Sequence, residues 1–159
     1  MNSKNNTLKL FALHLKQDDP KKNTILKLAR FNMVKIYRNF SEIPRNVLLL
    51  DPFSDYFITF QDRSHLEKYG ICVIDCSWAK IDLVFKNKFR MGRKLPNLLA
   101  ANSVNYGKWN KLSSAEALAA SLFITGFEEK AKELLSKFSW GNSFWEINKE
   151  NFKTLEKKN

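Results

Sequence analysis

Apolar residues form two kinds of pattern along this chain, short continuous runs and runs with helical spacing. Continuous runs occur at Val47–Leu50 and Ile71–Trp78, and Leu8–Leu15 alternates between apolar and polar positions as a strand does. A continuous apolar run bounded by turn residues is typical of a strand buried on both faces of a parallel sheet. The segment Val34–Arg38 is interpreted as a strand or an irregular segment, and Leu95–Ala101 as a further strand.

Helix signals stand between these runs. The predicted helices cover residues 25–29, Arg63–Tyr69, 114–126, Phe127–Phe138 and a final segment from about Ser143. Asn23 or Thr24 can cap the first helix, and Gly70 is a suitable residue to end the second. Ser113 and Glu116 have the spacing of a capping box at the start of the helix that ends near Gly126. Strands that alternate with helices favour an α/β fold with a largely parallel sheet.

Candidate chemistry follows the predicted strands. In open α/β sheets ligands bind beyond the carboxyl ends of the strands, where this chain would place Leu50–Pro52, Asp75–Trp78 and Asn102–Gly107. At such a rim Asp75 could take a proton, bind a ribose hydroxyl or orient a donor, or it could simply cap the next segment. Trp78 could cover an adenine or a sulfonium group, or pack in the core.

Composition and charge point to an anionic partner. The chain has 159 residues with 27 Lys and Arg against 16 Asp and Glu, a formal net charge of +11. Such a balance favours nucleic acid ahead of a membrane surface. Basic residues gather between positions 86 and 94 around Phe89 and Met91, and we interpret that segment as an RNA contact rather than a plain solvated loop. The predicted RNA-binding residues are Lys21, Lys22, Lys86, Lys88, Arg90, Arg93 and Lys94.

Several other functions lack their sequence motifs. The chain has neither the glycine pattern of dinucleotide-binding folds nor a phosphate-binding loop of the Walker type. His14 and His65 have no partner at metal-ligand spacing, so we interpret each as a packing or surface residue, and no metal is expected. Cys72 and Cys76 are interpreted as reduced, buried thiols in one strand of an intracellular protein. No apolar run approaches the length of a membrane span, and no signal peptide is apparent.

Four blocks of sequence carry a resemblance to a known family. They are DPKKNTILKLAR, VIDCSWAK, LPNLLAANSVNYGKWNKLSSAEALAASLFITG and LLSKFSWGNSFWEINKE. Together they resemble the 18S ribosomal RNA aminocarboxypropyltransferases of ribosome biogenesis, over about Leu8–Phe152. The resemblance implies a SPOUT-like parallel sheet with a deep trefoil knot towards the C-terminus. It also implies one compact unit over residues 1–159, with a small N-terminal α/β portion (about 1–45) and a SPOUT-like cofactor-binding portion (about 46–155).

The resemblance also implies a reaction. S-adenosylmethionine would donate its 3-amino-3-carboxypropyl group to N3 of a pseudouridine, or of N1-methylpseudouridine, in small-subunit rRNA, and Asp75 is the best candidate base. The cofactor-binding positions it implies are Thr24, Leu50, Pro52, Ile74, Trp78, Leu98 and Ser113. A monomer in the cytoplasm, acting on rRNA or a pre-ribosomal small subunit, is expected. The alternatives are a SPOUT-like RNA methyltransferase using the same cofactor and a non-catalytic RNA-binding assembly factor.

The chain departs from the family pattern at three places. Asn23-Thr24-Ile25 stands where Cys-Thr-Gly is usual, and Ser103 replaces a proline. Asp51 stands where serine is common, and an acid beside the cofactor could weaken its binding or reach solvent instead. Thr24, Asp75 and Trp78 are all retained, so we expect an active enzyme.

Overall fold

A computed structural model describes residues 7–15, 23–76 and 89–158 of the chain. Its centre is a five-stranded sheet in the order β2-β1-β4-β3-β5, and every neighbouring pair is parallel. The strands are β1 (Leu10–His14), β2 (Lys35–Tyr37), β3 (Leu48–Leu50), β4 (Ile71–Asp75) and β5 (Gly92–Arg93). The predicted α/β class with a parallel sheet is therefore confirmed.

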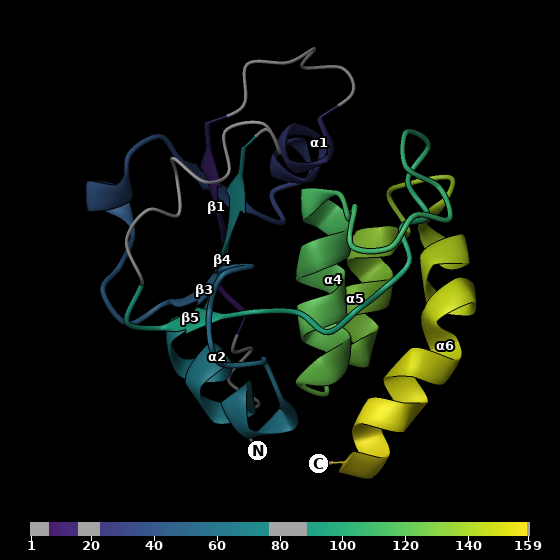
Figure 1. Ribbon diagram of the computed structural model, residues 1–159. Coiled ribbons are helices and arrows are strands. Elements are labelled where there is room, and N and C mark those ends of the chain that lie inside the picture. The colour runs from purple at the N-terminus through teal and green to yellow at the C-terminus, as the bar shows by residue number, and fades with distance from the viewer. Residues whose placement is uncertain (1–6, 16–22, 77–88, 159) are drawn as a thin grey trace, which may run out of the picture.

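The helices begin and end largely where the local signals place them. They are α1 (Thr24–Arg30), α2 (Arg63–Tyr69), α4 (Ser114–Ile124), α5 (Glu128–Leu135) and α6 (Gly141–Lys158), with short 3₁₀ turns η1 (Phe40–Glu42) and η2 (Phe60–Asp62). Gly70 ends α2 with a φ of 91°, a conformation that a side chain disfavours. Figure 1 shows α4, α5 and α6 together on one side of the sheet. Among the described helices, none is both long and apolar enough to cross a membrane.

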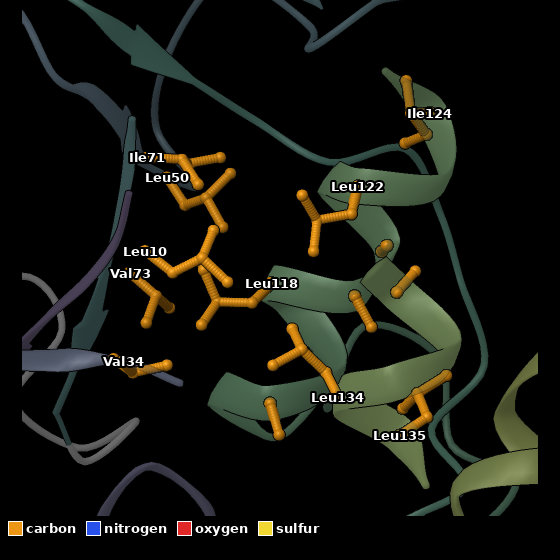
Figure 2. Close-up of a cluster of buried hydrophobic side chains, with 14 of the residues drawn as sticks. Leu10, Val34, Leu50, Ile71, Val73, Leu118, Leu122, Ile124, Leu134 and Leu135 are labelled. Carbon is orange, nitrogen blue, oxygen red and sulfur yellow. The ribbon is translucent and has the colours of Figure 1, made fainter. Parts of the chain in front are cut away.

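Strand residues alternate between two apolar clusters. Leu10, Leu50 and Val73 belong to the large cluster under α4, whereas their sequence neighbours face a smaller cluster on the opposite side of the sheet. Figure 2 shows Leu118 and Leu122 of α4 pointing towards the sheet residues. Burial on both faces explains why the sequences of β3 and β4 are continuous apolar runs rather than an alternation of apolar and polar residues. The packing holds α4 firmly against the sheet, which positions the N-terminus of that helix.

The prediction of a strand over Leu95–Ala101 is wrong. The residues that join the sheet are Gly92 and Arg93, just before this segment, and only Leu99 makes an isolated bridge, to Trp109. Leu98 and Ala100 form backbone hydrogen bonds with residues 107–110 of the same loop, and a side chain from α6 pairs with the backbone of Leu99. The Leu99 N–H donates to Asn148 Oδ1 at 2.8 Å, and Asn148 Nδ2 donates to the Leu99 carbonyl at 2.9 Å. Because buried backbone groups can be satisfied this way, an apolar run need not become a strand.

Candidate functional site

A cavity of about 860 Å³ opens where the carboxyl ends of β3 and β4 meet the N-termini of α1 and α4. This volume falls within the range of roughly 300–1,000 Å³ typical of small-molecule sites. Its wall combines apolar side chains such as Leu50 and Ile74 with polar ones such as Asn102. The location agrees with the rule that places ligands beyond the carboxyl ends of parallel strands.

Asp75 lies at the centre of a buried hydrogen-bond network in this wall. Its Oδ2 is 2.7 Å from His14 Nδ1 and accepts from Asn23 Nδ2 at 2.8 Å. Its Oδ1 accepts from Ser114 Oγ at 2.9 Å. The carboxylate therefore joins β4 to the neighbouring strand β1 and to the first residues of both α1 and α4. Only 5% of Asp75 is exposed, so these contacts set its orientation.

The Asp75 carboxylate retains capacity for one more donor. An ionised carboxylate offers about four lone-pair sites on its two oxygens. The three side chains occupy both sites of Oδ2 and one site of Oδ1. A further N–H approaching from the cavity can therefore be accepted by Oδ1. This is the geometry that a proton acceptor or a group that orients an ammonium needs.

The two helix N-termini are also joined directly. Asn23 caps α1 by accepting from the Leu26 N–H at 3.0 Å, while its amide donates to Asp75. Thr24 Oγ1 accepts from the Ala115 N–H of α4 at 3.3 Å. Asn23 and Thr24, at the start of α1, therefore orient both the Asp75 carboxylate and the start of α4. The N-terminal end of α4 carries positive partial charge towards the cavity, which suits an anionic group.

The loop between Ala101 and α4 is closed by one buried side chain. Glu116 Oε2 accepts from the Ala101 N–H at 2.7 Å, and Oε1 accepts from the Ser113 N–H and from Asn102 Nδ2. The capping box predicted for Ser113 and Glu116 is confirmed. Glu116 also ties the beginning of the loop to its end. Asn102 continues the network by accepting from the N–H groups of residues 104 and 105.

The departures at Asp51 and Ser103 both lie in turns. Asp51 is buried in the cavity wall, and its Oδ1 accepts from the Phe53 N–H at 2.9 Å. A serine hydroxyl can make the same turn contact, so the acid performs a role that the usual residue could fill. Ser103 is exposed, and the turn around it is built by Asn102. A serine in place of proline leaves those bonds intact.

The structure brings most of the predicted cofactor positions together. The predicted residues that line the cavity are Thr24, Leu50, Pro52, Ile74, Asp75 and Ser113, joined by Arg93 and Lys94 from the predicted RNA contact. Leu98 is fully buried in the core and is not part of this lining. Arg90 is exposed, away from the lining. Trp78, Lys21, Lys22, Lys86 and Lys88 fall outside the described residues.

Several site residues could not be identified from local sequence. His14 was interpreted as a packing or surface residue, yet it contacts Asp75 because the register of β1 and β4 pairs these two positions. Asn23 was expected only as a helix cap, and Ser114 only as the first residue of a helix. The contacts of all three with Asp75 span 39 to 61 residues of sequence, so no spacing pattern could reveal them.

The two cysteines differ in environment. Cys72 is buried in β4, and burial raises the pKa of its thiol to about 12, so the nucleophilic thiolate is absent at neutral pH. Cys76 follows the end of β4 and is half-buried in the cavity wall, which corrects the expectation that both lie buried in one strand. Neither cysteine forms a disulfide within the described residues.

Comparison with known proteins gives one consistent result. Residues 48–159 match the family model described as ribosome biogenesis protein, C-terminal. A 16S rRNA aminocarboxypropyltransferase from Thermoplasma volcanium is 50% identical over 139 residues, covering 87% of this chain and 84% of that protein. The enzyme of the same name from Methanosarcina mazei is 42% identical over 151 residues, covering 93% and 86%.

A solved structure extends this similarity to the fold. The SAM-dependent rRNA:acp-transferase Tsr3 from Vulcanisaeta distributa superimposes with a TM-score of 0.89 at 38% sequence identity. The match covers 94% of this chain and 83% of that one. From the family model, the close relatives and the shared fold, we conclude that this chain belongs to the rRNA aminocarboxypropyltransferase family.

Proposed function

We propose that this protein transfers the 3-amino-3-carboxypropyl group of S-adenosylmethionine to N3 of a pseudouridine, or its N1-methyl form, in small-subunit rRNA. Relatives of this chain are named 16S rRNA aminocarboxypropyltransferases. The observation that carries the proposal is the cavity beside Asp75, whose wall contains six of the positions implied by the family resemblance. The buried carboxylate held by three donors supplies a fixed acceptor in that wall.

The cavity wall fits the donor substrate. In the proposed arrangement Leu50 and Pro52 lie against adenine, Ile74 lies near the ribose, and Thr24 lies near the methionine moiety. The positive end of α4, beside Thr24, suits the carboxylate of that moiety. The resemblance also implies that Trp78, outside the described residues, would pack against the cofactor, whereas Leu98 supports the pocket only from the core behind its lining.

Asp75 acts on the acceptor base in this proposal. S-adenosylmethionine supplies a carbon chain bonded to a positively charged sulfur. N3 of the acceptor forms a bond to the γ carbon of that chain, while the carbon–sulfur bond breaks with its electron pair moving to sulfur. The N3 proton must leave, and we assign it to Asp75 Oδ1, which accepts from one donor and has capacity for another. The wall selects the transferred group by deciding which carbon on sulfur faces the acceptor.

We also propose the further properties that the family resemblance implies. The protein has a SPOUT-class fold with a deep trefoil knot, is a monomer, and acts in the cytoplasm on rRNA or the pre-ribosomal small subunit. The predicted basic contacts, from Lys21 to Lys94, would hold the phosphate backbone while the target base enters the cavity.

Isotope transfer tests the proposed reaction. The protein is incubated with small-subunit rRNA and S-adenosylmethionine labelled either in the carboxyl carbon or in the methyl carbon. Carboxyl label in RNA, with release of methylthioadenosine, is the expected result. Methyl label in RNA would identify a methyltransferase instead. If neither label entered RNA and calorimetry detected no cofactor binding, the protein would be a non-catalytic assembly factor.

A further inference from the structure

Aromatic side chains are displayed to solvent along one segment beside the cavity. Tyr56 is 68% exposed, Phe57 53% and Phe60 48%, whereas Ile58 between them is buried. We call residues 56–60 the aromatic strip. Water-exposed aromatic rings gathered in one place are unfavourable unless another molecule covers them, and such patches mark interaction surfaces.

The backbone of the aromatic strip is held against the edge of the sheet. The Ile58 N–H donates to the Lys94 carbonyl at 2.9 Å, and the Lys94 N–H donates to the Tyr56 carbonyl at 2.8 Å. The Tyr56 N–H also donates to Ser54 Oγ, which in turn donates to the Gly92 carbonyl. The rings therefore project from a fixed backbone, so a partner that covers them need not order the loop first.

A cationic side chain accompanies each ring. Lys94 Nζ lies 4.4 Å from the Phe57 ring centroid, and the Arg93 and Arg63 guanidinium carbons lie 5.6 Å and 5.9 Å from Tyr56 and Phe60. Aromatic rings interleaved with Lys and Arg are the surface that single-stranded nucleic acid requires. Bases stack on the rings while the cations contact the phosphates. Arg93 also pairs with Asp62 and Arg63 donates to the Thr125 carbonyl, so a partner protein's apolar face would chiefly leave the charge of Lys94 unmatched.

The aromatic strip is continuous with the cavity. Phe57, Arg93 and Lys94 belong to the cavity wall as well as to this surface. We propose that the aromatic strip is a stacking platform for the unpaired RNA bases adjacent to the target nucleoside. The inference rests on the proposed function, because it assigns the strip to the RNA substrate of the same cavity. Unpaired bases are required because bases inside a duplex have no free face for a ring.

Fluorescence anisotropy with a labelled single-stranded oligouridylate of about 12 nucleotides tests this platform, since stacking tolerates any base. Tyr56→Ala and Phe57→Ala are each expected to lower RNA affinity at least about five-fold. The slope of log K against log salt is expected to stay unchanged, because no cation is removed. Phe57→Trp is expected to restore affinity.

Phe31→Ala is the matched control. Phe31 is 50% exposed with Lys137 Nζ 4.8 Å from its ring, but it lies at the far end of α1 and not in the cavity wall. Its loss should leave RNA affinity unchanged. If the strip variants bind RNA as tightly as the unsubstituted protein, the platform is overturned while the proposed function stands, and a protein partner becomes the better occupant. If the unsubstituted protein does not bind the oligouridylate, the platform is likewise overturned, and the isotope-transfer experiment with small-subunit rRNA decides separately whether the proposed function fails.

Discussion

At the scale of single residues, the site depends on how Asp75 is held. A carboxylate at the end of an apolar strand can serve several roles, and its neighbours decide among them. Asn23 and Ser114 donate to it and His14 Nδ1 lies 2.7 Å from it, and each of the three comes from a different part of the chain. Such a network costs stability unless every group is satisfied, and within the described residues no buried side-chain N or O lacks a partner.

Replacing Asp75 tests its proposed role as base. Asp75→Asn is expected to lower turnover by roughly 100-fold or more, because general-base catalysis contributes about that much. Cofactor affinity, measured by calorimetry, should change by a much smaller factor than the rate at which methylthioadenosine is released. Ser114→Ala is the comparison, since it removes one donor and keeps the carboxylate. Turnover of Asp75→Asn close to that of the unsubstituted protein would exclude Asp75 as the base.

At the scale of elements, the loop before α4 is ordered by buried side chains as well as by backbone hydrogen bonds within the loop. Asn148 of α6 binds both backbone groups of Leu99, and Glu116 of α4 binds both ends of the loop. Both side chains are fully buried. Because Ser113 and Asn102 of this loop line the cavity, the shape of the cavity depends on these two polar anchors.

Substituting the anchor in α4 should destabilise the protein. Glu116→Gln replaces one acceptor oxygen by an amide that faces an N–H donor, so the free energy of unfolding is expected to fall by about 1–3 kcal/mol. Urea denaturation measures this change. Glu150→Gln is the matched control, because the Glu150 side chain is 88% exposed on α6 and surface substitutions change stability by no more than about 0.5 kcal/mol. Equal effects of the two substitutions would show that Glu116 is not an anchor.

At the scale of the whole molecule, the parallel sheet and the surface charge work together. The strand order places β1 beside β4, which brings the N-terminal part of the chain to the same edge as the later strands. The net charge of +11 favours an anionic partner. Arg93 is partly engaged within the protein, since it pairs with Asp62 at 3.2 Å, whereas the Lys94 ammonium lies over an exposed ring.

The salt dependence of RNA binding should distinguish these two cations. Lys94→Gln is expected to reduce the slope of log K against log salt by about 0.7, the contribution of one phosphate contact on a single strand. Arg93→Gln should change the slope less and lower the melting temperature more, because it breaks the pair with Asp62. Lys153→Gln on α6 removes the same charge elsewhere. If Lys153→Gln changed the slope as much as Lys94→Gln does, Lys94 would not make a specific contact with RNA.

Local sequence determined the elements whose signals are themselves local. The caps at Asn23 and Ser113 and the end of α2 at Gly70 follow from contacts within a few residues, so they could be predicted. The strands β3 and β4 could be predicted because burial on both faces leaves a continuous apolar run. The family resemblance indicated six residues of the cavity wall, including Thr24.

Only the tertiary structure decided how these parts meet. Leu95–Ala101 has the composition of a strand, but Asn148, distant in sequence, satisfies Leu99 and the segment leaves the sheet. His14 becomes a partner of Asp75 through the register of two strands separated by about sixty residues. Register and side-chain pairing across such separations depend on packing that no short sequence window contains. Sequence alone therefore predicted Asp75 as a candidate site residue, and the fold determined what holds it in place.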